Sequence, residues 1–269
     1  MLLILRNNAL RYLKVYRPSS TLSLSNQHIV DGHLCNEISI TLKNNVSIIV
    51  LEASAAAQDK LVDISLESDN DVDPYGSVLW PSSVLCAEKL FESSLKDKVV
   101  LDVGTGTGIL AIAAILAGSR KAIALDYNKF ALNLLEKSKN LQNNKLVSDR
   151  IETMEFDVTN FAMKLPASDV VCFADVLYEK DLGLAIADRI FESVNRGSRV
   201  LLVSPNHRPG KPFLISRLKE LFKNSNNLDN VKKLDGKITT TDVAMPARDS
   251  LTSDIRGTTL LQEMFILEL

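Results

Sequence analysis

A glycine-rich stretch at positions 104–108 is the segment whose residue types point most directly to chemistry. It reads Gly-Thr-Gly-Thr-Gly, follows the apolar run Val99–Val103 and precedes an apolar helix expected at Ile109–Ala117. Glycines at such a turn let the backbone bend tightly and approach a ligand closely. Because ligands of open α/β sheets bind at the carboxyl ends of strands, the stretch predicts a small-molecule site.

The spacing of these glycines distinguishes between nucleotide ligands. The dinucleotide fingerprint G-x-G-x-x-G needs its third glycine at position 109, which is Ile109. The chain instead has G-x-G-x-G, formed by Gly104, Gly106 and Gly108, with Asp102 two residues before it. A carboxylate there disfavours a diphosphate but is useful beside an amino group. The pattern therefore favours S-adenosylmethionine.

Two further aspartates lie at the ends of the next expected strands. Asp126 ends the run Ala122–Asp126, where a carboxylate can accept hydrogen bonds from both hydroxyls of a ribose. Asp157 follows the run Ile151–Phe156 and is placed to accept from an adenine amino group. Each has a structural alternative, which is a helix N-cap for Asp126 and a turn residue for Asp157.

Strand and helix patterns alternate along the rest of the chain. Further strands are expected at Val170–Phe173 and Val200–Val203, and helices at 82–93 (capped by Ser82 or Ser83), Lys129–Gln142, Leu182–Val194 and Phe213–Phe222. Apolar strands that alternate with helices argue for a parallel sheet covered on both faces. Lys237–Val243 and Leu260–Leu269 lack a full helix between them and should pair antiparallel. The predicted fold is α/β, a doubly wound, Rossmann-like seven-stranded sheet, mostly parallel with an antiparallel C-terminal strand.

A β-rich extension is expected before this fold, at residues 31–73, with the main domain at 74–269. Apolar residues alternate within 36–66 around the turn-forming pair Asn44-Asn45, which predicts one or two β-hairpins. A polar, acidic stretch from Glu67 to Asp73 then leads into the main domain.

Residues 1–30 differ from the rest because they contain no Asp or Glu, yet they carry Arg6, Arg11, Lys14 and Arg17. An amphipathic, Arg-rich, Ser-rich and acid-poor segment is typical of an organellar transit peptide. The alternative is an ordinary basic helix or strand that packs on the domain. The expected location is therefore the cytoplasm, or the mitochondrion or plastid if the segment is a transit peptide.

Composition argues against several functions. Among 269 residues, 31 are basic and 33 acidic, so a nucleic-acid partner is not expected at a net charge of −2. The longest apolar run is too short for a membrane span. The three cysteines and three histidines show no metal-ligand spacing, so no metal is expected. The chain is expected to be intracellular and, by default, monomeric.

Two more segments, taken with the glycine loop, carry a family resemblance. Tyr75–Ser82 is similar to a Gly-x-x-Leu-Trp-Pro-Ser motif, and Asp175-Val176-Leu177-Tyr178 matches an Asp-x-x-Tyr motif. The chain thus resembles the seven-β-strand S-adenosylmethionine-dependent methyltransferases over roughly residues 74–222. More narrowly, it looks like the family 16 group, which contains many protein-lysine methyltransferases. The segments 178–182 and 205–209 look closest to the mitochondrial electron-transfer-flavoprotein lysine methyltransferases.

The resemblance implies roles for individual residues. The implied cofactor contacts are Trp80, the backbone of Gly104, Thr105 and Gly106, Asp126 on the ribose, and Ala174 at the methionine end. Val158 stands where several relatives carry an aromatic residue, so it implies apolar contact with adenine in place of stacking. Trp80, the only tryptophan of the chain, has the alternative of being a core residue.

Transfer to lysine would need an amine that is deprotonated and oriented, since free lysine has a pKa near ~10.4. Asp175 is the candidate for orienting the amine, with Tyr178 as a packing or hydrogen-bonding support. A helix cap at Asp175 and a core role for Tyr178 are the structural alternatives. The predicted function is methylation of a protein, most readily on lysine. The alternatives are a small-molecule methyltransferase, a nicotinamide-dependent oxidoreductase and a non-catalytic binding protein.

Overall fold

The computed structural model describes residues 21–67, 73–225, 234, 236–246 and 259–269. Residues 1–20, which hold the basic positions behind the transit-peptide hypothesis, lie outside the described residues, as does most of the acidic stretch 67–73. The last ten residues of the segment 1–30 form strand β1 (Thr21–Val30). The N-terminal sheet therefore begins earlier than the expected boundary at residue 31.

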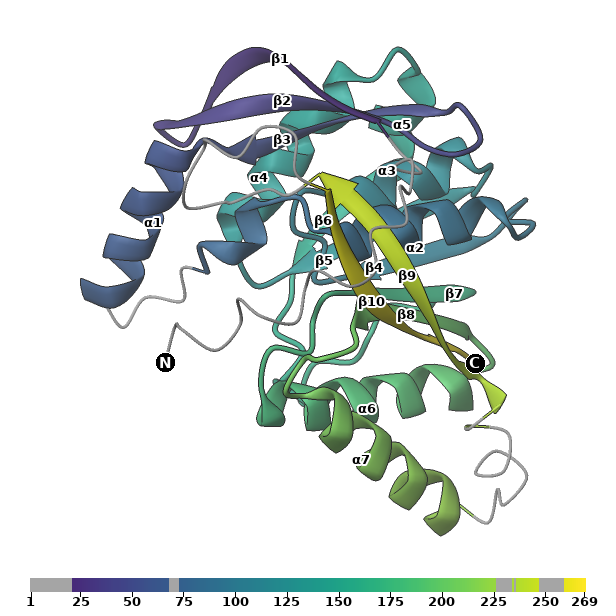
Figure 1. The fold of residues 1–269 in the computed structure, drawn as a ribbon. Coiled ribbons are helices and arrows are strands. Elements are labelled where there is room, and N and C mark those ends of the chain that lie inside the picture. Colours follow the sequence, from purple (N-terminus) through teal and green to yellow (C-terminus); the bar gives the residue numbers. More distant parts are fainter. Residues whose placement is uncertain (1–20, 68–72, 226–233, 235, 247–258) are drawn as a thin grey trace.

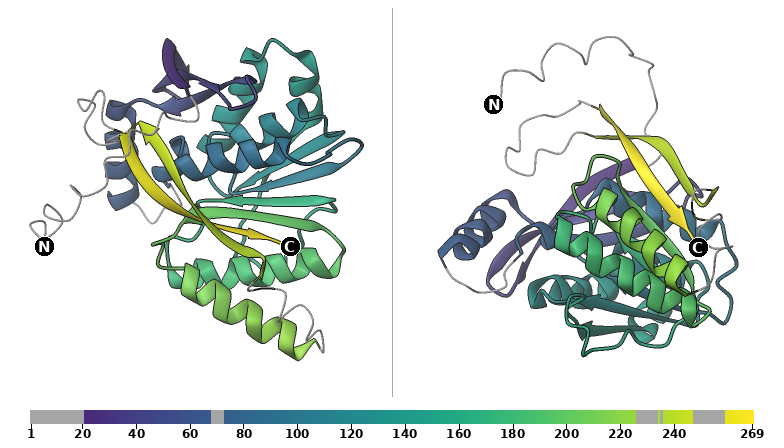
Figure 2. Two further views of the ribbon diagram at one scale, coloured as in Figure 1. Left: turned by 45° about the vertical axis from the view of Figure 1, so that its right-hand side comes forward. Right: turned by 90° about the horizontal axis from the view of Figure 1, so that it is seen from below.

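A seven-stranded sheet in the order β6-β5-β4-β7-β8-β10-β9 forms the centre of the fold (Figure 1). Its strands are β4 (Val99–Val103), β5 (Lys121–Asp126), β6 (Ile151–Glu155), β7 (Val170–Ala174), β8 (Arg199–Pro205), β9 (Ile238–Pro246) and β10 (Thr259–Glu268). The first five strands of this order are parallel, and β10 is antiparallel to both β8 and β9. The doubly wound Rossmann-like fold predicted from the sequence is confirmed. In Figure 2, β9 and β10 form a long ribbon at one edge of the molecule.

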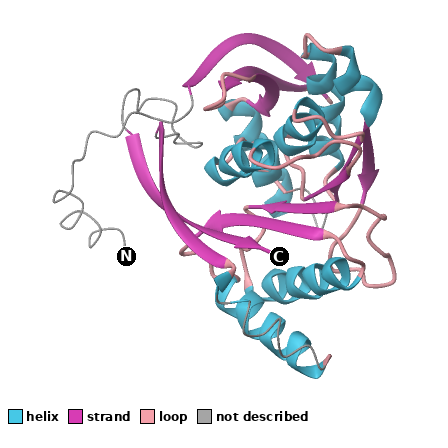
Figure 3. Cartoon of the chain, turned by 90° about the vertical axis from the view of Figure 1, so that its right-hand side faces the viewer, coloured by secondary structure: helices cyan, strands magenta, loops and turns pink. Residues whose placement is uncertain are grey.

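Helices cover both faces of this sheet (Figure 3). They are α2 (Pro81–Phe91), α3 (Ile109–Leu116), α4 (Lys129–Ser138), α5 (Lys145–Arg150), α6 (Lys180–Asn195) and α7 (Lys211–Asn224). Successive residues of a strand point to opposite faces. Val100 and Cys172 therefore belong to the core formed with α2 and α3, whereas Leu101 and Phe173 belong to the core formed with α6 and α7.

A separate three-stranded antiparallel sheet precedes the main domain and consists of β1, β2 (His33–Thr41) and β3 (Ser47–Ala53). The predicted hairpin turn is confirmed at Asn45, whose φ of 62° suits an asparagine. The sheet contacts α4, because the Leu51 amide donates to Ser138 Oγ at 2.9 Å.

Two local expectations were wrong, and one helix was missed. Residues 55–66 lie in a helix, α1 (Ala55–Glu67), and not in a hairpin, because three consecutive alanines favour a helix and Ser54 Oγ accepts from the Ala57 amide. Helix α2 begins at Pro81 with Trp80 as its N-cap and no side-chain cap, so neither Ser82 nor Ser83 caps it. Helix α5 was not predicted, since its single turn is too short for a periodic pattern.

Candidate functional site

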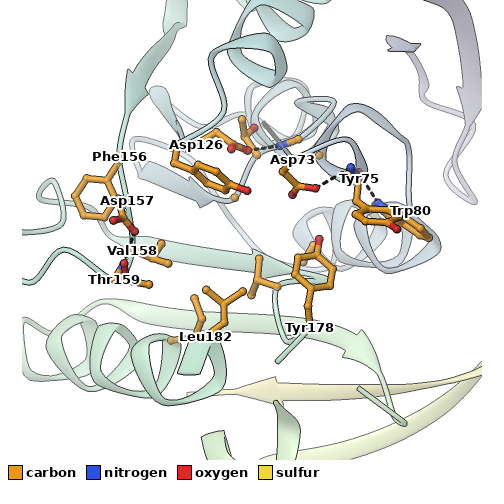
Figure 4. A pocket seen from close by; sticks show the side chains of 18 of the residues that line it. Asp73, Tyr75, Trp80, Asp126, Phe156, Asp157, Val158, Thr159, Tyr178 and Leu182 are labelled. Atoms are coloured by element: carbon orange, nitrogen blue, oxygen red, sulfur yellow. Dashed lines mark hydrogen bonds between the residues drawn. The ribbon is translucent and has the colours of Figure 1, made fainter. Parts of the chain in front are cut away.

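A cavity of about 780 Å³ lies at the carboxyl ends of β4, β5, β6 and β7 (Figure 4). The strand order reverses between β4 and β7, which is where open α/β sheets bind ligands. Register brings the strand ends level, because Val103 pairs with both Leu125 and Phe173. Of the residues predicted from the sequence, nine line the cavity: Trp80, Gly104, Thr105, Gly106, Asp126, Asp157, Val158, Ala174 and Tyr178.

The glycine loop is held by backbone hydrogen bonds to the neighbouring strand. The amides of Gly104 and Thr105 both donate to the Leu125 carbonyl, at 2.8 and 2.9 Å. A side chain at Gly106 would strain the loop for two reasons. The backbone φ is +52°, and a Cβ would lie 3.1 Å from the Gly76 carbonyl oxygen. A Cβ at Gly104 would lie 2.9 Å from Val176 Cγ1. The loop therefore presents bare backbone to the cavity.

Asp126 connects this loop to the next helix. Its Oδ2 accepts from the Gly106 amide and its Oδ1 from the Asn128 amide, both at 3.0 Å. Asn128, whose side chain accepts from the Phe130 amide, is the N-cap of α4, so the N-cap alternative for Asp126 was wrong. Burial raises the pKa of Asp126 to about 6, and its two amide bonds partly offset this. The carboxylate is therefore largely ionised at neutral pH.

Asp102 and Gly108 were predicted to contact the ligand, but both lie behind the loop and do not line the cavity. Asp102 is fully buried and accepts from Thr105 Oγ1 at 2.6 Å, and burial raises its pKa to about 7. Gly108 has a φ of +81°, and a Cβ there would lie 2.3 Å from Leu135 Cδ1. The chain needs these two residues to support the loop and to let α4 pack closely.

One end of the cavity is formed by the segment after β6, with Phe156, Asp157, Val158, Thr159 and Met163 among its lining residues. Asp157 Oδ1 accepts from both the amide and the hydroxyl of Thr159, at 2.8 and 2.7 Å. Asp157 is thus a turn residue that also lines the cavity, and its contact with an adenine stays a prediction.

The other end brings together Trp80, Tyr178, Asp73 and Tyr75 (Figure 4). Trp80 Nε1 donates to the Tyr75 carbonyl at 2.9 Å, and the Tyr75 amide donates to Asp73 Oδ1 at 2.8 Å. Burial raises the pKa of Asp73, and it also raises that of the Tyr178 hydroxyl well above its ordinary value. Sequence analysis missed Asp73 and Tyr75 as site residues, although both flank the tryptophan motif.

Asp175 does not line the cavity, although its neighbours Ala174 and Val176 do. Its Oδ1 accepts from Arg208 Nε at 2.7 Å, and its Oδ2 accepts from Ser82 Oγ at 3.3 Å. The side chain is 1% exposed, and it caps no helix, because α6 begins after Glu179. Both carboxylate oxygens are therefore already engaged within the chain.

Arg208 connects this aspartate to the aromatic end of the cavity. Its guanidinium lies over the rings of Trp80 and Tyr178, at 5.7 and 5.1 Å from their centroids. Such cation–π contacts stabilise a ring in one position. The segment after β8 thus holds the two aromatic residues that lie beside Asp73.

The charge of the cavity has one sign. Its lining includes Asp73, Asp126, Glu155, Asp157 and Glu179, and no lysine or arginine is found among the described residues that line it. A field of this sign attracts cations and repels phosphate groups. The charged residues of the site therefore favour a positively charged ligand over a dinucleotide diphosphate.

Comparison with known proteins agrees with this geometry. Residues 73–202 match the family model described as ribosomal protein L11 methyltransferase (PrmA). The matched segment, which is a little under half of the chain, is thus similar to a class I methyltransferase. Methyltransferases of this class use S-adenosylmethionine as methyl donor, which confirms the cofactor expected from the loop spacing. The matched range contains the whole cavity.

Several curated relatives that this chain matches are bacterial. A ribosomal protein L11 methyltransferase of Pseudomonas fluorescens is 30% identical over 165 residues, which cover 60% of this chain and 51% of the relative. One from Psychrobacter arcticus is 37% identical over 114 residues, covering 41% and 36% of the two chains. One from Prochlorococcus marinus is 45% identical over 65 residues, covering 23% and 22%. The chain spans about half the length of these relatives or less.

Solved structures with a similar arrangement include two at 16% identity. A ribosomal protein L11 methylase of Lactobacillus delbrueckii gives a TM-score of 0.40 and covers 70% of this chain and 79% of that one. A putative RNA methyltransferase of Pyrococcus horikoshii gives 0.45 and covers 78% and 96%. In the part of the chain that the structure describes, no helix is long and apolar enough to cross a membrane, and no group of three or more His, Cys, Asp or Glu residues is placed to hold a metal.

Proposed function

We propose that the chain is an S-adenosylmethionine-dependent methyltransferase that modifies a protein on lysine, within or close to the Asp-x-x-Tyr group. The observation that carries this proposal is one cavity that brings the Asp126–Gly106 pair together with Asp73 and two aromatic residues, and whose charged lining residues are all acidic. The cofactor and an approaching lysine are both cationic, so one field favours both.

In this proposal, three parts of the cavity each contact a different part of the cofactor. Asp126 accepts the ribose hydroxyls, since its carboxylate is fixed by two amides and is ionised at neutral pH. Asp157 and Val158 contact the adenine. The backbone of Gly104–Gly106 approaches the methionine portion, where the absence of a Cβ leaves the necessary room.

At the acceptor end, the chain supplies orientation. S-adenosylmethionine, when bound, would supply a methyl group from its sulfonium, so that the lysine Nζ–carbon bond would form as the carbon–sulfur bond breaks. Of the carboxylates that line the cavity, Asp73 is the one joined to Trp80 through Tyr75, so we assign the orientation of the amine to Asp73. Burial next to apolar rings lowers the pKa of a lysine and so favours its neutral, nucleophilic form. The proton lost by the amine passes to water.

Asp175 and Tyr178 then have different parts in the same proposal. Tyr178 faces the acceptor and packs against it, with its hydroxyl directed into the cavity end that holds Asp73 (Figure 4). Asp175 acts through Arg208, because its carboxylate is bonded to that guanidinium and not directed at the cavity. Asp175 is therefore a positioning residue, and the role of direct amine partner that its motif suggested passes to Asp73.

A protein acceptor is favoured by the relatives, which are described as ribosomal protein L11 methyltransferases. The test is to incubate the purified chain with S-adenosylmethionine labelled on the methyl group and with fractionated cell extract, then to locate the label by mass spectrometry. Asp126→Ala serves as the inactive control. Label on a lysine of a protein supports the proposal. Label on another protein group shows that the acceptor is a protein but not its lysine. Label only in the small-molecule fraction favours a small-molecule methyltransferase.

A further inference from the structure

A buried arginine, Arg189, lies behind the wall of the cavity that faces the adenine in the proposed function. It is on α6, one turn after Ile186, which itself lines the cavity. Its side chain is 0% exposed, and arginine is almost never fully buried unless its charge is compensated. The groups that surround the Arg189 side chain therefore indicate its role.

The guanidinium is bonded chiefly to backbone, and all of that backbone belongs to the segment after β6. Nε donates to the Val158 carbonyl at 2.9 Å, Nη2 to the Asn160 carbonyl at 2.8 Å, and Nη1 to the Met163 carbonyl at 2.9 Å. Three carbonyls within six residues thus converge on one planar side chain. The segment 156–165 contains neither helix nor strand, so it lacks the regular hydrogen bonds that would otherwise fix it.

Two aromatic rings and one carboxylate complete the site of Arg189. The guanidinium carbon lies 5.1 Å from the ring centroid of Phe156 and 4.8 Å from that of Phe161. Glu192, one turn further along α6, accepts from Nη1 at 2.9 Å and compensates the charge. Glu192 also accepts from the Leu165 amide at 3.2 Å, so the same cluster holds the far end of the segment.

We propose that Arg189 is a positioning residue that shapes the base-binding wall and thereby sets the selectivity of the site for the nucleobase of the cofactor. Val158 and Met163, two of the residues whose carbonyls it holds, line the cavity, as do Asp157 and Thr159 between and beside them. The inference rests on the proposed function, because it takes the ligand at this wall to be adenine.

The rigidity of this wall is what makes it selective. A carbonyl or carboxylate that accepts from the 6-amino group of adenine discriminates against a base with an oxygen there only if it cannot move away. A lysine at position 189 keeps the charge but offers a single point donor in place of the planar fork that bonds three carbonyls. The wall would then relax, whereas the glycine loop and Asp126, which Arg189 does not contact, would keep their positions.

The experiment compares two ligands that differ only in the base, S-adenosylhomocysteine and S-inosylhomocysteine, by calorimetric titration. The wild-type chain should prefer the adenosyl ligand by about tenfold or more. Arg189→Lys should bind the adenosyl ligand about tenfold more weakly and should lose most of this preference. Arg217→Lys is the matched control, because Arg217 joins α7 to Asp188 of α6 at the surface and should leave both affinities unchanged.

Phe161→Leu keeps the test decisive if Arg189→Lys does not fold. Phe161 is 47% exposed and contacts the guanidinium from the solvent side, so its loss should leave the fold intact and reduce the preference by a few-fold. A folded Arg189→Lys chain, or Phe161→Leu chain, that keeps the full wild-type preference overturns the inference while leaving the proposed function intact. A wild-type chain that binds neither ligand overturns the proposed function itself.

Discussion

Where Asp126 meets the glycine loop, the cavity is held by backbone amides and one buried carboxylate within a short stretch of chain, residues 104–128. The end at Trp80 and Tyr178 is assembled differently, from side chains in three distant segments that Arg208 and Asp175 join. The geometry of the first end follows from the spacing of residues that are close in sequence. The geometry of the second end depends on how the fold brings distant segments together. The difference suggests that cofactor binding and methyl transfer can be disrupted separately.

The largest effect is expected on the free energy of unfolding, at Asp102, which is buried behind the glycine loop. Its pKa is raised to about 7 in the folded chain, whereas an unfolded aspartate has a pKa of ~3.9. The folded state therefore retains a proton that the unfolded state loses, and the free energy of unfolding falls as pH rises from about 4 to about 7. Asp102→Asn, which has no carboxyl to titrate, should remove most of this fall, which amounts to roughly a few kcal/mol.

Urea unfolding at a series of pH values measures this prediction. A smaller fall up to about pH 6 should remain in the variant, because Asp126 has a pKa raised to about 6. Asp169→Asn is a control of opposite sign, since the Val99 amide lowers the pKa of Asp169 and its removal should cost a little stability at pH 8. The same pH slope in Asp102→Asn as in wild type would contradict the account.

The second largest effect should come from Asp126→Ala, which removes the carboxylate from the cofactor end. Affinity for S-adenosylhomocysteine should fall by about 100-fold or more, since two ribose hydrogen bonds to a charged acceptor are lost. Calorimetric titration gives the value. Asp157→Ala, at the exposed turn of the same cavity, should weaken binding by about tenfold at most. Normal binding by the Asp126 variant would show that the ribose lies elsewhere.

Asp175→Asn tests whether methyl transfer can be slowed while the affinity for the cofactor is kept. The substitution leaves the Arg208 charge without its carboxylate, so Trp80 and Tyr178 lose a fixed support. We expect methyl transfer to slow by about 30-fold, equivalent to ~2 kcal/mol, with the affinity for S-adenosylhomocysteine unchanged. Asp188→Asn, which removes the partner of Arg217 at the surface, should change neither quantity. A full transfer rate in Asp175→Asn would remove its positioning role.

Tyr178→Phe should have the smallest effect. The ring and its contact with Arg208 remain, and only the hydroxyl that faces the acceptor is lost. Transfer should slow by about fivefold, with the affinity for S-adenosylhomocysteine unaltered. Single-turnover rates at saturating cofactor measure it. If cofactor affinity fell as much as the rate, Tyr178 would belong to the cofactor end and the two ends would not be independent.

The sequence allowed the cofactor end to be predicted in some detail, because its parts follow one another along the chain. Strand β4, the glycine loop and Asp126 lie where the apolar runs and spacing placed them. The same pattern also misassigned Asp102 and Gly108, since a motif cannot tell which members face the ligand and which support the loop from behind. Burial and the close approach of Leu135 decide that, and both arise from packing.

The acceptor end was predicted only in part. Trp80 and Tyr178 were found through their motifs, but the bond between Arg208 and Asp175 joins residues 33 positions apart and follows from two strands lying side by side. Asp73 belongs to an acidic stretch that was assigned to the β-rich extension at residues 31–73. Helix α1 was missed for a related reason, because the alternation in the preceding strands was extended across an alanine run that favours a helix.

The most direct test of the central claim is thermal unfolding of the full chain with and without S-adenosylhomocysteine, with NADH as the parallel control. A ligand at about 100 times its dissociation constant stabilises the folded state by ~2.7 kcal/mol. The midpoint should therefore rise by roughly 5–10 °C with S-adenosylhomocysteine and stay unchanged with NADH. A rise with NADH alone, or with neither ligand, would contradict an acidic cavity built for S-adenosylmethionine.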